Sequence, residues 1–390
     1  MRDVKRLKAG RRSLCSAAVA LILMAVLIIL PSVSGFASVD EALQGPFTLT
    51  VNPGNNDSEE QIADLRTANV TIDLYKIADV QKVSGYDTFE FVLKKDANGE
   101  EDRTYGSLFS EDLASISNKE ITSEEWEAIA QKAAALVLDP DQGIAIQSPD
   151  QSGGDIETPI DVKAAGLYLV VPRGTDTTYV EKSEDGDIVT IATSDTYKYS
   201  FLPQLISFPS KDADENGVIN TANTGDWLKD VTINLKFSYE ERLGALDIIK
   251  GLEVYETKDP ATFVFQVTGR TPAGAVIFSN SYSMVFDLDT PREQKVSIND
   301  LPAGTIVTVK EAYSGSSFER IVPSDSDTII ADPIKAKDVV KVEFNNTYDG
   351  TYKGGGSAEN VFTKGEDGWN WYKVVDGKKV EINNEQNEQD

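Results

Sequence analysis

Residues 246–250 read Leu-Asp-Ile-Ile-Lys, and the stretch has the alternation of a half-buried β-strand. Successive side chains of a strand point to opposite faces, so Leu246, Ile248 and Lys250 share one face. Because the apolar members of that face are expected in a core, the lysine amine is expected there too. A buried charge needs a partner or must become neutral, so the pattern predicts a chemical role for Lys250.

Two further strands of the same block place a polar residue on an apolar face. Residues 307–311 read Val-Thr-Val-Lys-Glu and end in Glu311, while residues 342–346 read Val-Glu-Phe-Asn-Asn and end in Asn346. The alternation therefore predicts an amine, a carboxyl and a carboxamide enclosed in one dry core.

These three groups together can make a covalent bond. Burial favours the neutral amine of Lys250, which is a nucleophile, and the protonated carboxyl of Glu311, which can donate a hydrogen bond to the Asn346 carbonyl. The amine would attack, ammonia would leave, and an isopeptide bond would join two strands, with Glu311 carrying the protons. The reaction occurs once per molecule, so the chain is not expected to be an enzyme. In the alternative, Lys250 snorkels, Glu311 pairs with it and Asn346 caps a turn.

Composition limits the other possibilities. The chain has 390 residues with 37 Lys+Arg against 64 Asp+Glu, a net charge of −27. This balance argues against nucleic acid as a partner. Histidine is absent, which excludes catalytic dyads and triads built on histidine and removes the commonest transition-metal ligand. No cofactor or metal is expected.

The N-terminus indicates export. A basic region precedes the apolar run 17–30, and Gly35 and Ala37 fit a cleavage site, so residues 1–37 are interpreted as a signal peptide. An uncleaved membrane anchor is the alternative. The single cysteine, Cys15, lies before the apolar run, so the mature chain is expected to contain no disulfide. The expected location is secreted, at the extracellular cell surface.

The rest of the chain divides into three blocks. Residues 46–240 show strands such as 89–93, 167–171 and 231–237, interrupted by one helix that begins with a Thr122–Glu125 capping box. The block 241–349 has only short strands and turns. The fold class is therefore all-β, with two immunoglobulin-like β-sandwich domains, the first with an inserted α-helix. Residues 350–390 form a tail with a Gly-rich linker and a β-hairpin signal at Asp376-Gly377.

The second block resembles a known family. The stretches that carry the likeness are Gly244-Ala245-Leu246-Asp247-Ile248-Ile249-Lys250, Leu301-Pro302-Ala303-Gly304-Thr305 with the strand to Glu311, and Val342 to Tyr348. They resemble a Cna protein B-type (CnaB) domain of Gram-positive pilins and surface adhesins. The resemblance covers 244–348. It implies an inverse immunoglobulin-like sandwich in which Lys250 and Asn346 form the crosslink and Glu311 is the bond-forming acid.

The first block is similar, more loosely, to the N-terminal domain of sortase-assembled pilins, through stretches such as Leu74 to Asp79 and Gly166 to Val170. Lys76 is in phase with an apolar face, but no Glu or Asn occupies the matching places, so no bond is expected there. The resemblance makes Lys236 a candidate sortase acceptor. It is out of phase with its apolar neighbours and is expected to point to solvent, although an ordinary surface lysine is the alternative.

No Leu-Pro-x-Thr-Gly signal with an apolar span and basic tail occurs in the sequence. The resemblance therefore implies a sortase acceptor, an accessory subunit or a secreted relative rather than a sortase donor. The expected partners are other pilus or surface subunits.

The alternative function is an adhesin module that binds a glycan or host protein. Trp369, Trp371 and Tyr372 are candidate ligand-contact aromatics for a cell-wall or host glycan. A hydrolase that uses two carboxylates is a third hypothesis, but no pair stands out at a recognisable spacing. The acidic stretch 212–223 copies the start of a calcium loop and is better explained as a turn.

Overall fold

The computed structural model describes residues 38–54, 58–86, 88–96, 98–108, 122–211, 227–351, 360–365, 368–375 and 378–381. The signal peptide at 1–37, the acidic stretch 212–223 and the Gly-rich linker lie outside these residues. None of the helices within the described ranges is long and apolar enough to cross a membrane.

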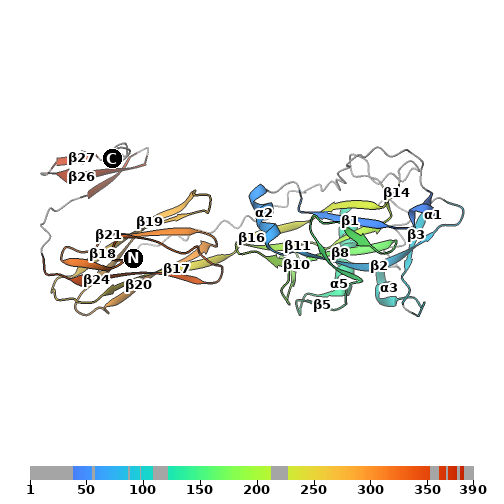
Figure 1. The fold of residues 1–390 in the computed structure, drawn as a ribbon, viewed down its shortest axis with the longest axis horizontal. Coiled ribbons are helices and arrows are strands. Elements are labelled where there is room, and N and C mark those ends of the chain that lie inside the picture. The colour runs from blue at the N-terminus through green and yellow to red at the C-terminus, as the bar shows by residue number, and fades with distance from the viewer. Residues whose placement is uncertain are drawn as a thin grey trace. The chain divides into compact units, whose positions relative to one another are not determined.

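The chain divides after Arg242 into two compact units, and both are built mainly of β-strands (Figure 1). We call the part up to Arg242 the first unit and the part from Leu243 the second unit. In both units an early strand pairs in parallel with a late one, whereas most other pairs are antiparallel. The all-β class with a helix in the first unit is confirmed.

The central sheet of the first unit is buried on both faces. It runs in the order β12 (Gln204–Phe208), β8 (Gly166–Arg173), β2 (Thr71–Lys82) and β3 (Phe89–Leu93), and β6 (Gln151–Asp155) also pairs with β2. One face, with Ile72 and Val170, packs on β1 and β15, and the other, with Tyr75 and Leu169, packs on helix α5 (Figure 1). Burial on both faces explains the continuous apolar run in β8.

Two smaller sheets and several short elements complete the first unit. One sheet has the order β15 (Asp230–Asn234), β1 (Phe47–Asn52) and β7 (Ile160–Val162), and the other has the order β16 (Phe237–Glu241), β11 (Tyr197–Phe201), β10 (Ile188–Thr193) and β9 (Val180–Lys182). The short elements are α1 (Val39–Ala42), α2 (Glu59–Thr67), a 3-10 turn (Arg103–Tyr105), α3 (Gly106–Leu108), and the pairs β4 (Leu138–Asp139) with β5 (Ile144–Ala145) and β13 (Ser210–Lys211) with β14 (Trp227–Leu228).

Helix α5 (Ser123–Val137) begins at the predicted capping box. The Thr122 hydroxyl accepts from the Glu125 amide at 3.2 Å, and the Glu125 side chain accepts from the Thr122 amide at 2.9 Å. These bonds satisfy backbone donors that the first turn would otherwise leave open. Ile129 and Ala133, which are three and seven residues after Trp126, are buried against the central sheet.

The second unit contains a two-sheet sandwich. One sheet has the order β20 (Glu293–Pro302), β17 (Leu243–Leu252), β24 (Val339–Tyr348) and β22 (Phe318–Val322). The other has the order β19 (Val276–Phe286), β18 (Ala261–Arg270), β21 (Ile306–Tyr313) and β23 (Thr328–Ile330). One cluster of buried aliphatic and aromatic side chains, with Phe263, Phe265 and Phe344 among its largest, fills the space between the sheets.

One predicted strand of the first unit is wrong in its extent. Residues 231–237 were expected as a single strand, but the structure ends β15 at Asn234 and starts β16 at Phe237. β15 pairs with β1, whereas β16 pairs with β11 in a different sheet. The chain therefore changes sheets at Leu235 and Lys236, although buried and half-buried residues still alternate from Val231 to Lys236.

The tail contains a three-stranded sheet of β25 (Asn360–Gly365), β26 (Gly368–Val375) and β27 (Lys378–Glu381). Val375 pairs with Lys378 in antiparallel register, so the predicted hairpin is confirmed and gains a further strand, β25.

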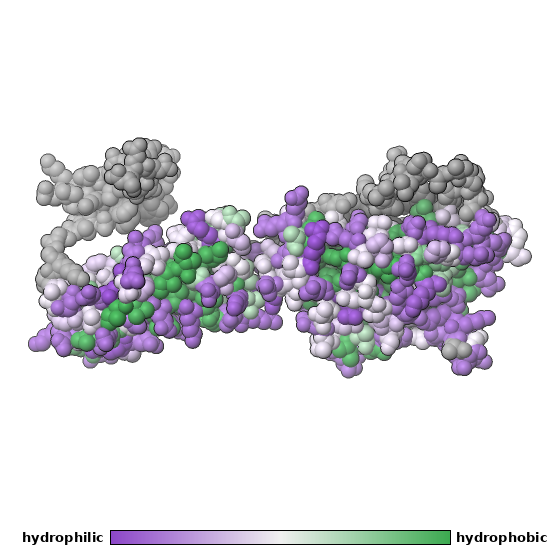
Figure 2. Space-filling model, viewed as in Figure 1, coloured by the Kyte–Doolittle hydropathy of each residue, from purple (hydrophilic) through white to green (hydrophobic). Residues whose placement is uncertain are grey.

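Figure 2 shows a largely hydrophilic surface on the visible face, with a band of hydrophobic residues on the unit that holds β17 to β24.

Candidate functional site

The structure brings Lys250, Glu311 and Asn346 together inside the second unit. Their exposed fractions are 0%, 2% and 0%. Lys250 lies on β17 and Asn346 on the neighbouring parallel strand β24, where Leu252 is the register partner of Asn346. Glu311 comes from β21 in the facing sheet. The alternation of β21 is intact through Val307, Val309 and Glu311, which explains why the carboxyl points into the core.

The three side chains are within contact distance. The Lys250 Nζ donates to the Asn346 Oδ1 at 2.6 Å and lies 3.3 Å from the Glu311 Oε1. The Asn346 Nδ2 donates to the Glu311 Oε2 at 3.4 Å. The phenyl ring of Phe263 covers the amine, with 4.7 Å between Nζ and the ring centroid. Each reacting group therefore contacts the other two.

Burial lowers the pKa of Lys250 to about 8 from its ordinary value of 10.5. The Glu311 carboxylate opposes this change by favouring the charged amine, and the positive charge of Arg320 acts in the same direction as burial. A lysine with this pKa is deprotonated in a sizeable fraction of molecules near neutral pH, which is the form that can attack a carbonyl carbon.

Arg320 is a member of the site that the sequence analysis missed. It lies on β22, beside Asn346 in the register of β24, and its Nε donates to the Glu311 Oε2 at 3.1 Å. The same signal could have identified it, because Arg320 is in phase with the buried Phe318 on its strand. Its side chain is 24% exposed, so it connects the buried carboxylate to the surface.

The orientation of Glu311 differs from the expectation that it donates to the Asn346 carbonyl. Its Oε2 faces the amide nitrogen, which is the leaving group, and the carbonyl oxygen instead accepts from Lys250. The Oε1 lies beside the amine and makes no hydrogen bond within the described residues. One oxygen of the carboxylate thus faces the attacking nitrogen and the other faces the leaving nitrogen, which is the arrangement that proton transfer between them requires.

The structure gives Lys236 and Lys76, the two lysines considered in the first unit, different surroundings. Lys236 was expected to point to solvent, and this is wrong. Its side chain is 15% exposed, and its Nζ lies 3.3 Å from the Glu127 carboxylate of helix α5. Lys76 is 17% exposed and pairs with Asp79 at 2.5 Å, without an amide partner. The acceptor role of Lys236 stays a prediction.

The other candidate sites receive less support. Trp369, Trp371 and Tyr372 lie on β26, but their side chains are outside the described part of the chain, so the glycan hypothesis stays untested.

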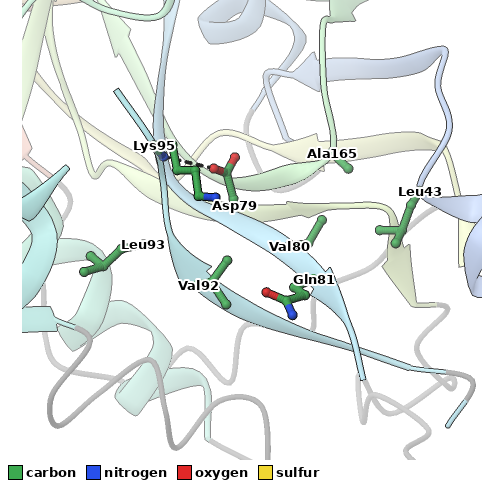
Figure 3. A pocket seen from close by; sticks show the side chains of 8 residues that line it. All are labelled: Leu43, Asp79, Val80, Gln81, Val92, Leu93, Lys95 and Ala165. Carbon is green, nitrogen blue, oxygen red and sulfur yellow. Dashed lines mark hydrogen bonds between the residues drawn. The ribbon is translucent and has the colours of Figure 1, made fainter. Parts of the chain in front are cut away.

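A surface hollow of about 360 Å³ in the first unit is lined by Leu43, Asp79, Val80, Gln81, Val92, Leu93, Lys95 and Ala165 (Figure 3). The Asp79 carboxylate in it already accepts from the Lys95 amide at 3.2 Å and pairs with Lys76. No cluster of acidic or cysteine ligands able to hold a metal occurs among the residues that the structure describes.

Residues 247–349 match the family model of a domain of unknown function, DUF5979. The match contains Lys250, Glu311 and Asn346, and it covers about a quarter of the chain. No curated protein matches the chain.

Several solved structures of Gram-positive pilus proteins are similar to the chain at low identity. The minor pilin GBS52 of Streptococcus agalactiae is 13% identical over 79% of this chain and 99% of its own, with a TM-score of 0.20. The major pilin T-13 of Streptococcus pyogenes is 9% identical over 78% of this chain and 96% of its own, with a TM-score of 0.21. The pilus-presented adhesin Spy0125 (Cpa) is 12% identical over 77% of this chain and 60% of its own, with a TM-score of 0.24. TM-scores this low do not place individual residues of this chain onto those of the neighbours.

Proposed function

We propose that this chain is an exported, structural surface protein of the pilus type. Its second unit is locked by an isopeptide bond between Lys250 and Asn346 that forms without an enzyme. The observation that carries the proposal is the contact of 2.6 Å between the fully buried Lys250 Nζ and the Asn346 Oδ1, with Glu311 touching both side chains. Other pilus or surface subunits are the proposed partners, through the likeness of the second unit to the pilin domains.

The position of the bond suits a protein that carries mechanical load. It would tie the first long strand of the sandwich, β17, to the last, β24, across a sequence separation of 96 residues. A force or a protease that acts on the ends of the unit would meet a covalent closure instead of hydrogen bonds alone. A chain whose only cysteine is Cys15 cannot obtain such a closure from an internal disulfide.

The reaction balances with the groups present. The Lys250 amine passes a proton to the Glu311 Oε1 and attacks the Asn346 carbonyl carbon as the neutral form. The bond from that carbon to Nδ2 breaks as Glu311 returns a proton to the leaving nitrogen, and ammonia departs. Glu311 then takes up a second proton from the attacking nitrogen, so the new amide keeps one hydrogen on the former lysine nitrogen and the carboxyl ends protonated. Because the fold holds amine and amide in contact, the step is effectively unimolecular.

Mass spectrometry of the folded protein tests the proposal. The intact chain is expected to weigh one ammonia less than its sequence, and a digest is expected to contain one branched species joining the peptides of Lys250 and Asn346. Lys250→Ala and Asn346→Ala are each expected to restore the missing ammonia. Glu311→Gln, which keeps the shape of the side chain but cannot relay protons in the same way, is expected to leave the two peptides separate.

Two neighbouring substitutions serve as matched controls. Asn345→Ala removes a carboxamide next to the reacting one, and Lys310→Ala removes an exposed amine next to Glu311, so both variants are expected to keep the ammonia loss. An unshifted mass of the wild-type protein would reject the bond. A branched peptide that contains Asn345 in place of Asn346 would reject the assignment of the residue.

A further inference from the structure

Strand β19 leaves one edge of the second unit's sandwich unpaired. It stands at the end of the sheet order β19-β18-β21-β23, and β18 is its only ladder partner among the strands that the structure describes (Figure 1). The strand is 11 residues long, and Val276, Ile277 and Val285 on it are 55%, 42% and 47% exposed. Figure 2 shows hydrophobic residues gathered on this unit. An open edge of this length is a template on which another strand can pair.

The edge carries neither charge nor proline, two of the devices that usually prevent such pairing. Residues 276–286 contain no charged residue and no proline, although 26% of the whole chain is charged. The other three edges of the sandwich are charged or short. β20 contains Glu293 and Lys295, β22 contains Glu319, and β23 is only three residues long. Edge charges and short strands block pairing, so β19 is the edge that is open to it.

The regular part of β19 has defined limits. A register shift between Gly269 and Arg270 of β18 disturbs the ladder opposite Ile277. At the other end, the Gln294 side chain of β20 donates to the Val285 carbonyl at 2.7 Å and occupies that position of the edge. The free, regular segment between these limits is residues 278–284.

This segment is partly symmetric about its central residue, because Ser279 matches Ser283 and Phe278 and Met284 are both apolar, whereas Asn280 corresponds to Tyr282. It reads Phe-Ser-Asn-Ser-Tyr-Ser-Met, with Ser281 in the centre. An antiparallel pair of two identical segments centred on Ser281 would place Phe278 opposite Met284 and Ser279 opposite Ser283. Successive backbone carbonyls of a strand point to opposite edges. The Val285 carbonyl points to the open edge, where it accepts from the Gln294 side chain, so the carbonyls of the other odd-numbered residues of the segment also point to the open edge. Because the odd-numbered positions pair only with one another in this register, their donors and acceptors meet.

We propose that β19 is a self-association surface, where β19 of a second copy of this chain adds in antiparallel register about a two-fold axis at Ser281. The distribution of charge favours the approach of a second copy at the β19 edge. Two chains of net charge −27 repel each other over most of their surface, and an uncharged edge is where the repulsion is smallest. A two-fold contact uses the same surface of both copies, and a single open strand edge can supply that surface. The pairing would join the four-stranded sheets of two copies into one continuous sheet. It does not require the proposed isopeptide bond.

The test is a charge exchange at the two-fold axis, measured by analytical ultracentrifugation from micromolar to millimolar protein. The wild-type protein is expected to show a concentration-dependent dimer. The Ser281 side chain is exposed, so Ser281→Lys and Ser281→Glu preserve the fold, which a thermal melt of each variant checks. Each variant alone places like charges directly opposite one another and is expected to dimerise at least roughly tenfold more weakly. An equimolar mixture of the two is expected to recover the dimer, because the opposite charges then meet.

Ile330→Lys is the matched control, since Ile330 is 70% exposed on β23, the opposite edge of the same sheet. This variant is expected to dimerise like the wild type. A wild-type protein that stays monomeric at millimolar concentration overturns the proposal. So does a dimer that Ile330→Lys weakens and Ser281→Lys does not. If the mixture of Lys and Glu variants fails to restore association, the two-fold register about Ser281 is wrong.

Discussion

The Lys250 amine is buried away from water, where it has three polar contacts, with Asn346, Glu311 and the Phe344 carbonyl, and is covered by an aromatic ring. Glu311 satisfies its charge, yet burial outweighs that attraction and the pKa falls to about 8. Asn346 holds the carboxamide against the same nitrogen. A site that only needed to stabilise the fold would be better served by apolar side chains, because desolvating a buried ion pair costs about as much as the pair returns. The proposed crosslinking reaction would account for their presence.

The depressed pKa leads to a pH dependence of stability in a protein that cannot form the bond. In Asn346→Ala the Lys250 amine stays free. The pKa of Lys250 in the folded protein lies near 8, below its ordinary value of 10.5, so between these pH values the unfolded chain binds more protons. The free energy of unfolding is therefore expected to rise with pH across this window, by about 2–4 kcal/mol. Loss of the carboxamide removes an acceptor for the charged amine, which lowers the pKa of Lys250 further and keeps the sign.

Urea unfolding from neutral pH to above the ordinary lysine pKa measures this change. The double variant Lys250→Met/Asn346→Ala lacks the amine and provides the control, because all other titrating groups are shared. If both proteins show the same pH slope, Lys250 does not have a lowered pKa in the folded state.

At the level of elements, strand β8 shows how closely the first unit is packed. It lies between β12 and β2, with its side chains buried on both faces of the sheet. At its first residue, Gly166, a Cβ atom would lie 2.6 Å from the Ala78 carbonyl oxygen and 2.4 Å from the Lys76 Cε. The oxygen belongs to the backbone of β2 and cannot move away as a flexible side chain can. Gly166 is therefore required by the close approach of the two strands.

Gly166→Ala is expected to destabilise the first unit by about 1–3 kcal/mol, because overpacking a strand contact forces the backbone to shift. Gly106 is the matched control, since a Cβ atom there meets nothing within 4 Å. Gly106→Ala is expected to be neutral or slightly stabilising. Thermal unfolding of both variants measures the difference. Equal melting temperatures would contradict the requirement for glycine at position 166.

At the level of the whole molecule, the division after Arg242 implies two units with separate cores. The proposed crosslink would act on the second core alone. In the chain-entropy treatment of a disulfide, closing a loop of about 100 residues stabilises the folded state by roughly 4–5 kcal/mol, and an isopeptide bond constrains the unfolded chain in the same way. In the first unit, Lys76 pairs with Asp79.

Loss of the bond is accordingly expected to change one of two unfolding transitions. Lys250→Met keeps the volume of the side chain and removes the amine, and it is expected to lower the melting temperature of the second unit by roughly 20 °C or more. Trp126 and Trp227 lie in the first unit, and residues 243–349 contain no tryptophan. In a background where Trp369 and Trp371 are replaced by Phe, tryptophan fluorescence therefore follows the first unit, and calorimetry follows both. If Lys250→Met also lowers the temperature of the fluorescence transition, the two units do not unfold separately.

Local periodicity in the sequence was sufficient for the strands that contain the candidate triad, for the capped helix α5 and for the tail hairpin. The side-chain direction in a strand and the capping of a helix depend on residues a few positions apart, so these features can be read from neighbours in the chain. The inward direction of Lys250, Glu311 and Asn346 belongs to this class.

Only the tertiary structure decided which groups meet. It paired β17 with β24 in parallel, placed Glu311 opposite them from the other sheet, and added Arg320 to the carboxylate. It also turned the chain between sheets at Lys236 and set that side chain against Glu127 of α5. Such contacts join residues that are far apart in the sequence, and their geometry follows from how whole sheets and helices pack, which no local pattern encodes.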